Sequence, residues 1–119
     1  MRIIVCGGRS YSNKKRLYEV LDILLPIKDQ ITILQGEAPG ADALAKQWCE
    51  DRGVACSDFP ADWDKYRHLK KNPAGPIRNR QMFDSGCDLV IAFPGKIGTP
   101  DMCAYAKSKD CEVIKIDWD

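Results

Sequence analysis

Three short apolar runs, each followed closely by glycine, constrain the fold of this chain more than any other feature. Residues 2–6, 31–34 and 89–93 are almost wholly apolar, and Gly7, Gly36 and Gly95 follow them. Continuous apolar runs are typical of strands buried on both faces of a parallel sheet, whereas strands with one face in water alternate apolar and polar residues. The chain is therefore predicted to fold around a parallel sheet.

Segments with helical spacing alternate with the strands. Residues 15–25, 41–52, 76–83 and 100–109 are predicted helices, and residues 54–59 and 113–116 are predicted as a weaker edge strand and a closing strand. Pro76 suits a first helical position. With 119 residues, the chain is predicted to form one domain: an α/β, Rossmann-like doubly wound sheet in the order 3-2-1-4-5. Ligands of such sheets bind at the carboxyl ends of the strands, where the strand order reverses.

Three glycine-containing loops are predicted to meet at that edge: residues 7–10, 36–42 and 94–99. Glycine permits close backbone approach, and a helix N-terminus offers free N–H groups to an anion such as phosphate. The alternative is that these glycines only make turns. The predicted phosphate-binding residues in these loops are Gly7, Gly8, Arg9, Gly36, Gly40, Asp42, Pro94, Gly95, Lys96, Gly98 and Thr99.

The two common nucleotide fingerprints are missing. The sequence contains neither G-x-x-x-x-G-K-[ST] nor G-x-G-x-x-G, so it indicates neither a P-loop NTPase nor a dinucleotide-binding Rossmann domain. Glu37 follows the second strand, where a ribose-binding acid would lie in a dinucleotide-binding domain, but without the glycines this match is weak.

Basic residues concentrate between positions 65 and 80. This stretch holds six lysines and arginines, one histidine and no acid. Arg78, in the predicted first helical turn, is expected to face an anion in the crevice, and Arg80 to face the other way. Trp63, just before this stretch, either stacks on a base or pins its loop to the domain.

Composition restricts the partners and the compartment. The net charge of +1 argues against nucleic acid as the main partner. The apolar runs are too short to cross a membrane, and the first residues do not form a secretory signal, so a cytoplasmic location is expected. The six cysteines form no C-x-x-C pair and there is one histidine, so no metal or cofactor is indicated and the thiols are expected to be reduced.

Five motifs in order carry a family resemblance. They are Gly7-Gly8-Arg9, Gly40-Ala41-Asp42, residues 59–63 (FPADW), residues 74–79 (AGPIRN) and residues 93–102 (FPGKIGTPDM). Together they resemble the SLOG superfamily of Rossmann-like domains, in its YspA or cpYpsA-related branch, over essentially the whole chain. That superfamily includes the LOG phosphoribohydrolases, the DNA-processing protein DprA and nucleotide-signal sensors of bacterial immunity.

The resemblance implies a nucleotide ligand whose phosphate is held by residues 94–99, with Arg78 and Asn79 in the matching arginine motif. LOG enzymes carry P-G-G-x-G-T-x-x-E. Here Lys96 replaces the second glycine, Asp101 stands near the first carboxylate position, and Met102 replaces the last. The matching residues of the signature still imply a phosphate site, whereas these departures argue against the hydrolase chemistry of the LOG enzymes.

Three functions follow from these observations. The first is binding of a phosphorylated nucleotide or nucleotide-derived signal, which a bacterial or phage protein could sequester or report through a homo-oligomer. The alternative is phosphoribohydrolase activity, with Asp101 as the catalytic carboxylate; an aspartate in a first helical turn also simply complements the helix dipole. The third, single-stranded DNA binding through residues 65–80 and Trp63, is the least favoured because the net charge is near zero.

Overall fold

The computed structural model describes residues 1–117 and contains one five-stranded parallel sheet in the order β3-β2-β1-β4-β5, as predicted. The strands are β1 (Arg2–Cys6), β2 (Thr32–Gln35), β3 (Ala55–Asp58), β4 (Leu89–Ala92) and β5 (Glu112–Lys115). The α-helices are α1 (Lys14–Asp22), α2 (Ala41–Arg52), α3 (Ala74–Asp84) and α4 (Gly98–Ser108). Two 3₁₀ helices, η1 (Leu25–Gln30) and η2 (Asp64–Tyr66), lie in the connections.

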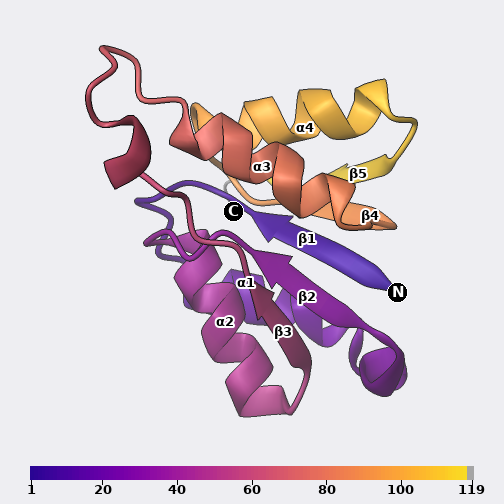
Figure 1. The fold of residues 1–119 in the computed structure, drawn as a ribbon. Helices are drawn as coiled ribbons and strands as arrows, with labels where there is room; N and C mark the ends of the chain where they lie inside the picture. Colours follow the sequence, from indigo (N-terminus) through magenta and orange to yellow (C-terminus); the bar gives the residue numbers. More distant parts are fainter. Residues whose placement is uncertain (118–119) are drawn as a thin grey trace.

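Helices cover both faces of the sheet. Figure 1 shows α1 and α2 on one side and α3 and α4 on the other. Alternate residues of β1 enter the two resulting cores: Ile3 and Val5 pack with α1 and α2, whereas Ile4 packs with α3 and α4. In the register, Ile4 lies between Leu34 of β2 and Val90 of β4. Burial on both faces explains why the three central strands are mainly apolar, with the polar residues Arg2, Thr32 and Gln35 at strand ends.

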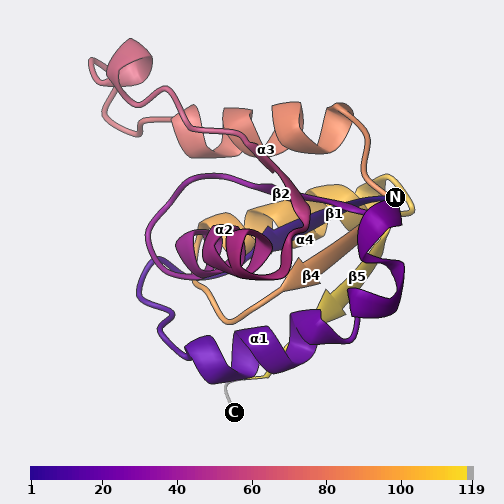
Figure 2. The same ribbon diagram turned by 90° about the horizontal axis from the view of Figure 1, so that it is seen from below.

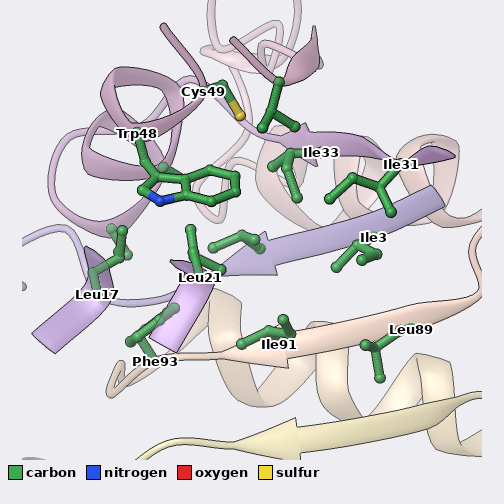
Figure 3. Close-up of a cluster of buried hydrophobic side chains, with 14 of the residues drawn as sticks. Ile3, Leu17, Leu21, Ile31, Ile33, Trp48, Cys49, Leu89, Ile91 and Phe93 are labelled. Carbon is green, nitrogen blue, oxygen red and sulfur yellow. The ribbon is translucent and has the colours of Figure 1, made fainter. Parts of the chain in front are cut away.

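Trp48 is central to the core on the α1 and α2 side. Its ring is fully buried, and Figure 3 shows it extending from α2 toward the sheet beside Leu21 of α1. Its indole N–H donates to Asp22 Oδ1 at 2.8 Å, so the polar end of this large side chain is paired at the end of α1. The same carboxylate accepts from Arg52 Nε at 2.9 Å, which joins the C-terminal ends of α1 and α2.

Three helix boundaries differ from the prediction. α1 stops at Asp22, and the residues around Pro26 form a 3₁₀ helix instead of its last turn. α4 runs from Gly98 to Ser108, slightly earlier than predicted. α3 begins at Ala74, so Pro76 is its third residue. A proline is tolerated there because the first four N–H groups of a helix have no intrahelical acceptor.

The cysteines are free thiols in the described part of the chain. Cys87 and Cys111 lie near the starts of β4 and β5, with their Sγ atoms 3.9 Å apart. Burial and the neighbouring thiol raise the pKa of Cys87 to about 12. Among residues 1–117, no helix has the length and apolar character needed to span a bilayer.

Candidate functional site at the carboxyl edge of the sheet

Buried polar side chains gather at the carboxyl edge of the sheet. In the described part of the chain, four polar or charged residues are buried: Gln35, Asp42, Asn79 and Thr99. Gln35 ends β2, Asp42 and Thr99 are the second residues of α2 and α4, and Asn79 lies in α3. Buried polar groups require partners or a ligand, so this edge differs from the rest of the interior.

The three glycine-containing loops lie together at this edge, as predicted. The N–H of Gly8 donates to Pro94 O at 2.7 Å, and the N–H of Ala41 donates to Gly8 O at 3.2 Å. Gly40 has a φ of +80°, and a Cβ there would overlap the carbonyl of Gly8. A Cβ at Gly7 would collide with Ala41 and Phe93. These glycines therefore let three backbones touch, which is a packing role.

Asp42 occupies the second loop. Its Oδ2 accepts the N–H groups of Gly36 and Ala38, both at 3.2 Å. Burial raises the pKa of this carboxyl to about 6, although the two N–H donors and the charges of Arg78 and Arg9 oppose the shift. The side chain thus places a negative charge where the amides of this loop could otherwise receive an external anion.

Glu37 adopts a strained backbone conformation in the same loop. Its φ of +55° falls in the left-handed region, which costs energy in a residue other than glycine. Its N–H donates to Gln35 Oε1 at 2.6 Å, and its carboxylate pairs with Lys46 at 3.0 Å. Lys46 also pairs with Asp58 at 3.1 Å, and the two carboxylates raise the pKa of Lys46. Glu37 is therefore held by protein groups.

The third loop offers free hydrogen-bond donors. The backbone N–H groups of residues 95–99 make no hydrogen bond to any residue in the range 1–117. Thr99 is only 8% exposed, but solvent reaches its hydroxyl, which makes no hydrogen bond with the same residues. That hydroxyl is directed toward Gly95, where a Cβ would collide with it, whereas a Cβ at Gly98 would meet open space. Lys96 is exposed beside these groups.

Arg78 is the fifth residue of α3, so the prediction that it lies in the first turn was wrong because the helix begins at Ala74. Its Nη1 donates to Gly36 O at 2.6 Å and to Phe59 O at 3.4 Å, and its Nε donates to Asn79 Oδ1 at 3.0 Å. Burial lowers the pKa of the guanidinium. The side chain is thus bound to the ends of β2 and β3.

Asn79 and Arg80 hold the start of α4. Asn79 Nδ2 donates to Gly98 O and to Asp101 Oδ2, each at 3.1 Å. Arg80 Nη1 lies 3.2 Å from the same oxygen of Asp101, on the side of α3 away from Arg78, as helical spacing predicted. Neither partner of Asp101 is predictable from the sequence, because local spacing carries no signal for a contact between two helices.

Residues 60–73, which we call the arm, extend from the carboxyl edge between β3 and α3 (Figures 1 and 2). Trp63 of the arm is 44% exposed, and Arg9 Cζ lies 6.0 Å from its ring centre. The ring also packs on Gly75, where a Cβ would lie 3.3 Å from it. Trp63 therefore pins the arm to α3 and still presents ring surface to solvent. The exposed basic residues of the arm are Lys65, Arg67, Lys70 and Lys71.

Among residues 1–117, no group of three His, Cys, Asp or Glu side chains is placed to hold a metal ion. The carboxylates of Asp42 and Glu37 at the carboxyl edge are engaged by protein groups, whereas the third loop presents N–H donors that are unpaired in the described chain, the hydroxyl of Thr99 and the exposed cation Lys96. Their chemistry suits an anion.

Comparison with known sequences gives a family and a phage relative. Residues 1–66 match the family described as "YspA, cpYpsA-related SLOG family". The Gene 61 protein of Mycobacterium phage D29 is 31% identical over 121 residues, covering 95% of this chain and 94% of the phage protein.

Solved structures share the fold at low sequence identity. DNA processing protein A (DprA) from Streptococcus pneumoniae superimposes with a TM-score of 0.79 at 19% identity, over 99% of this chain and 50% of that one. The protein of the same name from Helicobacter pylori superimposes with a TM-score of 0.68 at 14% identity, over 100% of this chain and 66% of that one. That structure is described for its single-stranded DNA binding mode. This chain therefore spans one half to two thirds of the DprA chains.

Proposed function

The chain belongs to the YspA, cpYpsA-related SLOG family, and we propose that it binds a phosphorylated nucleotide or nucleotide-derived ligand, with the phosphate against residues 95–99. The observation that carries this proposal is the hydroxyl of Thr99, which makes no hydrogen bond with residues 1–117 and is reached by solvent although the rest of the side chain is buried. It lies at the N-terminus of α4 beside five N–H groups that also lack partners there. Phosphate oxygens accept hydrogen bonds and carry the charge that a helix N-terminus favours.

In this proposal each of the three loops has a different role in binding the ligand. Residues 95–99 contact the phosphate, with the exposed side chain of Lys96 as a counter-charge. The glycines at positions 7, 8, 36 and 40 permit the close packing of the loops at the carboxyl edge. Arg9 and Arg78 add positive potential, while Asp42 keeps the second loop closed by accepting two of its N–H groups. Trp63, beside Arg9, presents exposed ring surface to solvent at the same edge.

Binding is favoured over hydrolysis by the partners of Asp101. A catalytic carboxylate that stabilises a cationic sugar needs an oxygen free to face it. Both oxygens of Asp101 face Arg80, and Oδ2 also accepts from Asn79. We therefore assign Asp101 to positioning α4. The engagement of both oxygens favours sequestration of a nucleotide signal over its hydrolysis.

The experiment that tests the phosphate site is calorimetric titration of ribose 5-phosphate into the wild type and Gly98→Leu. A Cβ at Gly98 would have no other atom of the protein within 4 Å, so a leucine there should extend into the space beside residues 95–99, and binding should be lost while the melting temperature is kept. Ala104→Leu, at an exposed position of the same helix, is the control and should bind normally. Equal binding by all three proteins would refute the site.

A second candidate is single-stranded nucleic acid, favoured by the arm. An exposed aromatic ring among cations is the combination that binds single strands by stacking and charge, and the described function of the Helicobacter pylori neighbour makes the test necessary. Fluorescence anisotropy of a labelled oligothymidylate would detect it. Binding that weakens with salt and is lost in both Trp63→Ala and the double variant Lys70→Glu/Lys71→Glu would support this candidate.

A further inference from the structure

A hollow of about 180 Å³ lies between the arm and one face of α3. Ala74, Ile77, Arg78 and Gln81 line it from the helix, and their spacing of three and four residues places them on one face. Tyr66 is among the residues that line it from the arm. For comparison, a cavity of about 150 Å³ accommodates a benzene ring. The hollow is therefore of the size that one flat ring system needs.

The arm is fixed at both ends of the hollow. Asn72 Nδ2 donates to Trp63 O at 2.8 Å, and Asn72 Oδ1 accepts the N–H of Ala74 at 3.0 Å. At the other end, the carbonyl of Phe59 accepts from Arg78. The space beneath the arm is therefore bounded by anchored chain on two sides, which favours a preformed site.

The polar lining of the hollow mixes donors and acceptors. Asp62 Oδ1 accepts the N–H of Lys65 at 3.2 Å, while its Oδ2 makes no hydrogen bond with residues 1–117. Arg78 Nη2 and the carboxamide of Gln81 also make no hydrogen bond with residues 1–117. A hydrocarbon ring would leave these groups unpaired at a cost, whereas the edge of a nucleobase carries both donors and acceptors.

A chain of hydrogen bonds joins the hollow to the proposed phosphate loop. Arg78, which lines the hollow, donates from Nε to Asn79 Oδ1 at 3.0 Å. Asn79 Nδ2 donates in turn to the carbonyl of Gly98 at 3.1 Å. The two places are therefore held in a fixed relation through two consecutive residues of α3.

From this arrangement we propose that the hollow between the arm and α3 receives the nucleobase of the ligand. The inference rests on the proposed function, because it assumes that the phosphate lies on residues 95–99. It assigns ligand selection to Asp62, Gln81 and Tyr66, and it makes the ligand a nucleotide with an intact base rather than a sugar phosphate.

The test compares ribose 5-phosphate with the four ribonucleoside 5′-monophosphates by calorimetric titration. At least one nucleotide should bind the wild type ten or more times more tightly than ribose 5-phosphate, the phosphate-bearing part that all four share. Ile77→Trp, which fills the hollow, should reduce the affinity for that nucleotide to the level of ribose 5-phosphate and leave the affinity for ribose 5-phosphate unchanged.

Gln81→Ala keeps the inference testable if the tryptophan variant does not fold, because residue 81 is exposed and alanine favours helix. It should weaken nucleotide binding several-fold and leave ribose 5-phosphate binding intact. Gln47→Ala, at an exposed position of α2, is the matched control and should change neither.

Two results separate the possible failures. If ribose 5-phosphate binds as tightly as every nucleotide, or the two variants lower both affinities equally, the base site is wrong while the phosphate site stands. If the wild type binds neither ribose 5-phosphate nor any nucleotide, the proposed function fails, and the base site fails with it.

Discussion

Arg80 and Asp101 form an ion pair between α3 and α4, with 3.2 Å between Nη1 and Oδ2. The pair lies at the first turn of α4, where a carboxylate also complements the helix dipole. Asn79 donates to the same carboxylate at 3.1 Å. Two structural demands thus account for an aspartate at this position without a catalytic role.

The first prediction concerns chemistry at Asp101. Wild type and Asp101→Asn should both leave nucleoside monophosphates intact over a long incubation, because the carboxylate is already engaged. Their affinities should differ by no more than about 1 kcal/mol, the usual range for a partly exposed ion pair. Liquid chromatography of the incubated nucleotide measures the free base. Base release by the wild type that slows a hundredfold or more in the variant would instead establish a hydrolase.

A second prediction concerns Thr99. Thr99→Val removes the hydroxyl and keeps the shape of the side chain, so phosphate binding should weaken by about 1–2 kcal/mol, the range for one hydrogen bond to a charged group. The free energy of unfolding should not fall, because the hydroxyl has no partner in the described chain. Calorimetric titration and urea denaturation measure the two quantities. A loss of stability with unchanged affinity would show that the hydroxyl serves the fold.

Arg78 and Arg80 should behave differently when each is changed to alanine. Arg78→Ala leaves the carbonyls of Gly36 and Phe59 without their donor, so we expect a loss of about 1–3 kcal/mol of stability together with weaker anion binding. Arg80→Ala removes a more exposed pair and should cost under about 1 kcal/mol. Urea denaturation gives the free energy of unfolding of each variant, and the loss should be larger for Arg78→Ala. Equal losses would mean that the carbonyl contacts of Arg78 contribute nothing.

Local patterns in the sequence predicted the strands and helices, and the sheet order and the meeting of the loops then followed from the topology of doubly wound sheets. Apolar runs identify the central strands, and Gly53, which ends α2 with a φ of +69°, is a local signal. α3 begins two residues earlier than predicted, where the side chain of Asn72 accepts the N–H of Ala74, and helical spacing carries no signal for a side-chain contact of that kind. Helical spacing also carries no signal for the hydrogen bond that Asp42 accepts within its own loop. This contact changes the interpretation of the second glycine loop.

The last prediction follows from the pKa of Asp42. Burial raises this pKa to about 6 from the ordinary value of 3.8, so the folded protein binds a proton at a pH where the unfolded chain has released it. The ionised carboxylate therefore destabilises the fold at neutral pH, and stability should rise as the pH falls through 6 toward 4. Between pH 7.5 and 5 the gain from this one group is about 1–1.5 kcal/mol.

Asp42→Asn keeps an acceptor oxygen for the N–H of Gly36 or Ala38 and cannot titrate, so its free energy of unfolding should rise less over the same interval. Urea denaturation of both proteins at several pH values gives the difference, which cancels the other titrating groups. If the wild-type and variant curves run parallel from pH 7.5 to 5, the carboxyl of Asp42 does not titrate in that range, and the loop holds a charge that remains ionised throughout.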